Sequence, residues 1–137
     1  MVNKDKTPVR LQKSKTEVVT TASSTEETVR AYFEDIPQLI EVARCESRFR
    51  QTDKDGSIFR GEMNNKDVGV MQINEFYHAD TAKKLGFDIY TLSGNMAYAR
   101  YIYEKQGIAP WSSSFPCWNK KVSQIEALGN VELALNK

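Results

Sequence analysis

Residues 36–47 carry the apolar spacing of a helix with one buried side, and a run of turn-forming residues follows them. Pro37 suits the first turn of such a helix, because its missing amide hydrogen would have no helical partner there. Leu39, Ala43 and Glu46 follow at the spacing that places side chains on one face. The pattern predicts a core helix whose buried side carries the Glu46 carboxylate near the C-terminal end.

The segment after this helix, residues 50–68, is predicted to form a small β-hairpin. Asp55-Gly56 is a preferred hairpin turn, and residues 58–60 can form a short strand beside it. A calcium-binding loop is the alternative, because acidic residues between positions 51 and 62 recur at the ligand spacing of an EF-hand. Gln51 stands where the first ligand would be Asp. The hairpin is therefore the favoured interpretation, and no metal site is expected.

Four further helices are expected, over residues 24–33, 75–85, 93–106 and 119–137, the last of which can also fray. Ser24 and Glu27 fit a capping box at the start of the helix over 24–33, and Ser93 can cap the helix over 93–106. Gly86 follows the helix over 75–85 and Gly107 follows the helix over 93–106, and glycine commonly ends a helix in this position. The whole pattern predicts an α+β fold that is mainly helical.

The length of 137 residues suits one compact domain, predicted as residues 24–137 after a flexible polar arm at residues 1–23. A formal net charge of +1 disfavours nucleic acid as the main partner. No apolar run approaches the roughly 18 residues of a transmembrane helix. No signal peptide is recognisable, although a mature secreted protein would look the same. A monomer is expected.

The two cysteines, Cys45 and Cys117, lack the Cys-x-x-Cys spacing of a redox pair or a zinc site. The one histidine, His78, has no nucleophile partner and is expected to be an ordinary surface or core residue. A single disulfide is the favoured interpretation of the cysteines, and two buried thiols are the alternative. The disulfide would close a long loop, which is worth roughly 4 kcal/mol in the chain-entropy treatment. It would also place the protein outside a reducing cytoplasm.

Glu46 is the first candidate for catalysis. Cleavage of a glycosidic bond needs a carboxylic acid that stays protonated near neutral pH. Burial against apolar neighbours raises the pKa of a carboxyl group, and the negative end of a helix dipole does the same. The predicted position of Glu46 has both features, whereas most glutamates late in a helix are simply solvated.

Three short motifs resemble the soluble lytic transglycosylase family of the lysozyme-like superfamily. Residues 46–49, Glu-Ser-Arg-Phe, look like the Glu-Ser motif of that family, and residues 69–72, Gly-Val-Met-Gln, look like its Gly-Leu-Met-Gln motif. Asn95, followed by Tyr98, resembles a third landmark. The resemblance spans residues 36–118, and the order and spacing of the motifs make it more specific than any one of them.

The resemblance implies a lysozyme-like fold with a small β-hairpin beside a catalytic cleft. It implies cleavage of the β-1,4 bond between N-acetylmuramic acid and N-acetylglucosamine in peptidoglycan, by lytic transglycosylation. Glu46 would be the general acid and base, and Gln72 would help to bind the N-acetyl group. No cofactor is expected, and the protein would act extracellularly or in the cell envelope. The other predicted substrate-binding residues are Ser47, Asn74, Tyr98 and Trp111.

Two departures from the family pattern leave alternatives open. Many members carry an Ala-Tyr-Asn motif where this chain has Trp111, which can either line the cleft or fill the core. Residues 67–74 are also similar to the Asp-Tyr-Gly-Ile-Leu-Gln-Ile-Asn run of chicken-type lysozymes, in which the Asp is a second carboxylate. Hydrolysis by Glu46 and Asp67 is therefore the alternative reaction, while Asp67 could also only cap a turn. A catalytically silent glycan-binding module is the alternative from another class.

Overall fold

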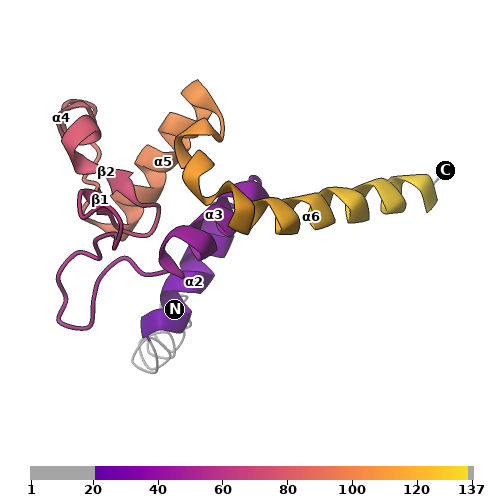
Figure 1. The fold of residues 1–137 in the computed structure, drawn as a ribbon, viewed down its shortest axis with the longest axis horizontal. Coiled ribbons are helices and arrows are strands. Elements are labelled where there is room, and N and C mark those ends of the chain that lie inside the picture. The colour runs from indigo at the N-terminus through magenta and orange to yellow at the C-terminus, as the bar shows by residue number, and fades with distance from the viewer. Residues whose placement is uncertain (1–20, 136–137) are drawn as a thin grey trace, which may run out of the picture.

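A computed structural model describes the backbone of residues 21–135 and the side chains of residues 24–128. Residues 1–20 of the predicted arm lie outside the described part of the chain. The elements follow in the order α2 (Thr21–Tyr32), α3 (Pro37–Ser47), β1 (Asp67–Val68), β2 (Ile73–Asn74), α4 (Glu75–Lys84), α5 (Leu92–Gln106), the 3-10 helix η1 (Ala109–Ser114) and α6 (Phe115–Leu135). Figure 1 shows that the fold is mainly helical, with one small sheet near α4 and with α6 extending away from the other helices. The prediction of a mainly helical α+β fold is confirmed.

Helix α3 is the central element and begins at Pro37, as the sequence predicts. Its buried face includes Leu39, Val42 and Ala43, and it contacts α2, η1 and α6. It ends at Ser47, and the next residue, Arg48, has a left-handed backbone (φ 55°) and an amide that donates to the carbonyls of Ala43 and Arg44. Glu46 therefore lies in the last turn of a core helix.

The β-structure differs in detail from the predicted hairpin. The Asp55-Gly56 turn forms, with Gly56 at φ 89° and a bridge between Thr52 and Ile58. Residues 58–60 make only isolated bridges, and the regular sheet is the antiparallel pair β1–β2, in register Asp67↔Asn74 and Val68↔Ile73. Residues 69–72, the Gly-Val-Met-Gln run, are the turn that joins the two strands.

The calcium-loop alternative does not fit the structure of residues 51–62. No helix begins directly after Glu62, where the second helix of an EF-hand would lie, and the next helix starts at Glu75. Gln51, at the first ligand position, is buried, and its Oε1 accepts a hydrogen bond from the Val70 amide at 2.9 Å. No group of three potential metal-ligating side chains occurs in the described part of the chain.

The helix boundaries correct the sequence predictions in three places. Helix α2 already begins at Thr21, so Ser24 lies inside the helix rather than at its cap. Thr91, not Ser93, caps α5, and its Oγ1 accepts from the Gly94 amide. Helix α6 begins at Phe115, directly after η1, and not at residue 119. Gly86 and Gly107 follow α4 and α5 with positive φ angles, as predicted.

Cys45 and Cys117 form a disulfide with their Cα atoms 6.0 Å apart, which confirms that prediction. The bond joins α3 to the start of α6. Trp118, next to Cys117, is 3% exposed and belongs to the core. Within the described residues, no helix combines the length and the apolar character needed to cross a membrane.

Candidate active site

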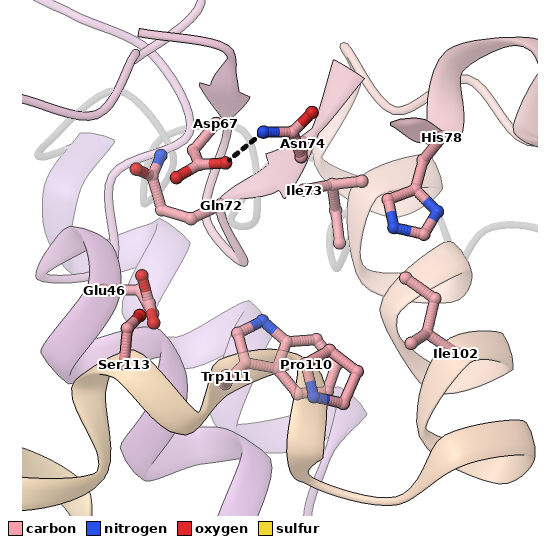
Figure 2. Close-up of a pocket in the computed structure, with 10 residues that line it drawn as sticks. All are labelled: Glu46, Asp67, Gln72, Ile73, Asn74, His78, Ile102, Pro110, Trp111 and Ser113. Atoms are coloured by element: carbon pink, nitrogen blue, oxygen red, sulfur yellow. Dashed lines mark hydrogen bonds between the residues drawn. The ribbon is translucent and has the colours of Figure 1, made fainter. Parts of the chain in front are cut away.

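Two adjoining hollows open beside the C-terminal end of α3. Both are lined by Glu46, Asp67, Gln72 and Ser113. The larger hollow has a volume of about 490 Å³, which lies in the range typical of small-molecule sites. The smaller one continues past Trp111 to His78 on α4 (Figure 2). The structure thus brings the two predicted catalytic carboxylates to one concave surface.

Glu46 is held by a residue that the sequence analysis did not select. The Ser114 hydroxyl, at the end of η1, donates to Glu46 Oε2 at 2.6 Å. Burial raises the pKa of Glu46, the Ser114 hydrogen bond opposes this effect, and the negative charge of Asp67 adds to it. Glu46 therefore keeps its proton to a higher pH than an exposed glutamate does, as a general acid requires.

Ser114 can serve both protonation states of Glu46. Its hydroxyl also lies 3.1 Å from the Trp111 carbonyl oxygen, within hydrogen-bond distance. When Glu46 is ionised, Ser114 donates to the carboxylate. When Glu46 is protonated on Oε1, Ser114 can still donate to Oε2, because a carboxylic acid keeps an acceptor oxygen beside its one hydrogen. The carboxyl group stays positioned in either state.

Asp67 lies across the hollow from Glu46 on strand β1, as Figure 2 shows. Its Oδ1 accepts a hydrogen bond of 3.0 Å from Asn74 Nδ2, its partner on β2. Burial raises the pKa of Asp67, and the Asn74 hydrogen bond opposes this. Asn74 also caps α4 by accepting from the Tyr77 amide at 3.1 Å. Asn74 lines the smaller hollow, where one hydrogen of its Nδ2 orients Asp67 and the second remains available.

Gln72 lies between the two hollows and beside Asp67 (Figure 2). Its backbone is left-handed, with φ 52°, and its Nε2 donates to the Gly69 carbonyl at 3.0 Å. A Cβ atom at Gly61 would lie only 2.6 Å from Gln72 Oε1, so this glycine makes room for the amide. Within the described residues, the positive φ angles outside glycine belong to Arg48, Phe49 and Gln72. Such conformations cost of order 1–3 kcal/mol each and concentrate at functional sites.

The turn at residues 69–72 is fixed by buried side chains from three other segments. Ser47 Oγ on α3 donates to the Val70 carbonyl at 2.8 Å. Asn95 on α5 accepts from the Met71 amide at 2.8 Å and donates to the carbonyls of Val68 and Ile89. Together with the hydrogen bond from the Val70 amide to Gln51, these bonds give the backbone polar groups of the turn buried partners.

Trp111 completes this support. Its indole Nε1 donates to the Met71 carbonyl at 2.9 Å, and its side chain is 3% exposed. Ser47 and Trp111 were both predicted to bind substrate. Both are buried supports of the turn, and each also lines a hollow, Ser47 the larger one and Trp111 the smaller one. The third landmark, Asn95, likewise has a structural role.

Tyr98 lies apart from the carboxylates. It is 1% exposed and lines neither hollow, so the predicted direct contact with substrate does not fit its position. Its hydroxyl is 2.9 Å from His78 Nδ1, and His78 does line the smaller hollow. The sequence analysis treated His78 as an ordinary residue, because a partner twenty positions away leaves no local pattern.

No family model, curated protein or solved structure matches this chain. The argument for a function therefore rests on the geometry around Glu46, Asp67 and Gln72.

Proposed function

We propose that this protein cleaves the β-1,4 bond between N-acetylmuramic acid and N-acetylglucosamine in peptidoglycan by lytic transglycosylation. The observation that carries the proposal is the Glu46 carboxyl group, half-buried at the end of a core helix, with a raised pKa and a fixed orientation. It borders a hollow with a volume of about 490 Å³. The lysozyme-like character of the fold is part of this proposal.

Glu46 acts twice in this reaction. Its proton passes to the glycosidic oxygen as the bond to C1 of N-acetylmuramic acid breaks. The resulting carboxylate then removes the proton from the C6 hydroxyl of the same sugar, whose oxygen bonds to C1. The product ends in 1,6-anhydro-N-acetylmuramic acid, and Glu46 regains its proton. Ser114 supports the sequence, because it can hydrogen-bond to Glu46 in both states.

Gln72 is proposed to bind the N-acetyl group. It borders both hollows, and its Nε2 is held by the Gly69 carbonyl. An amide nitrogen has two hydrogens, so the second one remains available for a substrate carbonyl. Four buried side chains hold the turn that carries Gln72, namely Ser47, Gln51, Asn95 and Trp111. They keep the amide in place before substrate arrives, which reduces the entropy cost of binding.

Hydrolysis is the second candidate, and the position of Asp67 favours it. Asp67 faces the same hollow as Glu46, and its charge contributes to the raised pKa of Glu46. A retaining hydrolase would use Asp67 as the nucleophile about 5 Å from the acid, and an inverting one would use it to activate water at a larger separation. The two reactions leave different chain ends.

The disulfide bears on where the protein acts. The Cys45–Cys117 bond fits an oxidising compartment, and peptidoglycan lies in one. An extracellular or cell-envelope location therefore agrees with the proposed substrate.

Mass spectrometry of the products from purified peptidoglycan tests the proposal. Lytic transglycosylation yields 1,6-anhydro ends and no new reducing ends, whereas hydrolysis yields reducing ends. We expect Glu46→Gln to lower the cleavage rate by about 10²–10⁴-fold, since it removes the transferable proton. Glu104→Gln, on an exposed position of α5, is the matched control and should retain the parent rate.

A parent protein that binds peptidoglycan without releasing fragments would be the silent binding module. Equal cleavage by the parent and by Glu46→Gln would show that Glu46 is not the acid.

A further inference from the structure

The end of the smaller hollow that lies away from Glu46 holds a group that the proposed reaction does not use. His78 projects from α4 into this end, where Ile73 and Ile102 are its apolar neighbours in the lining (Figure 2). Nδ1 is turned away from the hollow and bonds to the Tyr98 hydroxyl at 2.9 Å. In Figure 2 the other ring nitrogen, Nε2, faces the interior near Ile73. Nε2 has no hydrogen-bond partner among the described residues.

The Tyr98 hydroxyl decides which nitrogen carries the proton. Tyr98 is 1% exposed and packs against Phe87 and Tyr101, so its ring is fixed. His78 Nδ1 is the only hydrogen-bond partner of this hydroxyl in the described chain. A buried O–H group without an acceptor costs about 1–3 kcal/mol, so the phenol donates and Nδ1 accepts. In the neutral ring the proton must then lie on Nε2.

We infer that His78 is a substrate-binding residue that presents a fixed, uncharged Nε2–H donor to a hydroxyl or amide carbonyl oxygen of the glycan, at a second sugar position next to the cleavage site. This inference rests on the proposed function. Tyr98 is the positioning residue that sets the tautomer. Burial lowers the pKa of His78, which agrees with a neutral ring.

The class of ligand follows from the surroundings. An uncharged donor between two isoleucines suits a neutral sugar oxygen, whereas a carboxylate of the peptide stem would favour an imidazolium or an arginine. Among the residues that line this hollow, the ionisable ones besides His78 are Glu46 and Asp67, and no lysine or arginine is present. The lining therefore offers an anionic group no cationic partner.

Nuclear magnetic resonance tests the tautomer directly, because the chain contains one histidine. Long-range nitrogen–proton correlations of the full chain, without a histidine tag, should show a protonated Nε2 and an unprotonated Nδ1 near neutral pH. Tyr98→Phe should release this preference and give a mixture of tautomers. Tyr77→Phe is the matched control, since Tyr77 is 75% exposed, and it should leave the spectrum unchanged. A protonated Nδ1 in the parent chain would overturn the inference.

Binding is measured with the Glu46→Gln chain, to prevent turnover, and an alternating N-acetylglucosamine–N-acetylmuramic acid tetrasaccharide. We expect the His78 Nε2 resonance to move on binding and His78→Phe to weaken binding by about three- to tenfold, the usual worth of one hydrogen bond. His78→Gln, which can place an amide hydrogen near the position of Nε2, should recover part of the loss. Tetrasaccharide binding with an unchanged His78 resonance overturns this inference and leaves the proposed function intact. A parent chain that neither binds the tetrasaccharide nor cleaves peptidoglycan overturns both.

Discussion

The disulfide should be the largest single contribution to the stability of the site, and its removal gives the sharpest quantitative prediction. Cys45 immediately precedes Glu46, and Cys117 follows Ser114, the residue that holds the Glu46 carboxyl group. The bond therefore fixes the two sides of this hydrogen bond to each other.

The magnitude follows from the length of the closed loop. The cysteines are separated by 72 positions, for which the chain-entropy treatment gives about 4 kcal/mol of stability. Cys45 is half-buried and Cys117 is exposed, so serine at both positions adds little cost of its own. Domains of this size have a total stability of about 5–15 kcal/mol. The Cys45→Ser/Cys117→Ser variant should therefore lose a large fraction of its free energy of unfolding.

Urea unfolding followed by tryptophan fluorescence measures this loss. Both tryptophans, Trp111 and Trp118, are 3% exposed, so unfolding should change their emission strongly. Reductant should destabilise the parent by a similar amount and leave the double-serine variant unchanged, which is the control. A loss below about 1 kcal/mol in the variant would refute the reasoning, because it would mean that the unfolded chain gains little freedom.

Three further variants test the carboxylates and the turn. Asp67→Asn should slow cleavage by less than about tenfold and leave 1,6-anhydro products, whereas loss of most activity together with reducing-end products would identify a hydrolase. Because the charge of Asp67 raises the pKa of Glu46, the same variant should move the alkaline limb of the pH–rate profile to lower pH. In the parent, the hydrogen bond from Ser114 lowers the pKa of Glu46. Ser114→Ala removes this bond and should therefore move the alkaline limb to higher pH; an unchanged profile would contradict the assigned contact. Trp111→Phe should cost about 1–3 kcal/mol of unfolding free energy by leaving the buried Met71 carbonyl without a donor, and a variant as stable as the parent in urea would contradict that.

Local sequence determined much of the framework. The apolar stripe and Pro37 predicted α3 and the position of Glu46 in its last turn, and the glycines at 86 and 107 predicted where α4 and α5 end. These features depend on contacts within one or two turns of helix, so residue spacing reveals them. The disulfide could be inferred for a different reason, since the chain has only two cysteines to pair.

The starts of α2, α5 and α6 were less predictable. Thr91 and Ser93 are both good capping residues, and the sequence does not say which of them will cap α5. In the folded chain the Thr91 hydroxyl caps α5 by accepting from the Gly94 amide.

The tertiary structure alone decided what the polar residues around Glu46 do. Ser114 and Glu46 are 68 positions apart, and Trp111 and Met71 are 40 apart, so no local pattern connects them. The sequence could place Ser47 and Trp111 near the motifs, but it could not tell a side chain that contacts substrate from one that supports the turn beneath it. That distinction depends on burial and on the direction of each hydrogen bond. Both are set only when α3, the β1–β2 turn, α5 and η1 pack against one another.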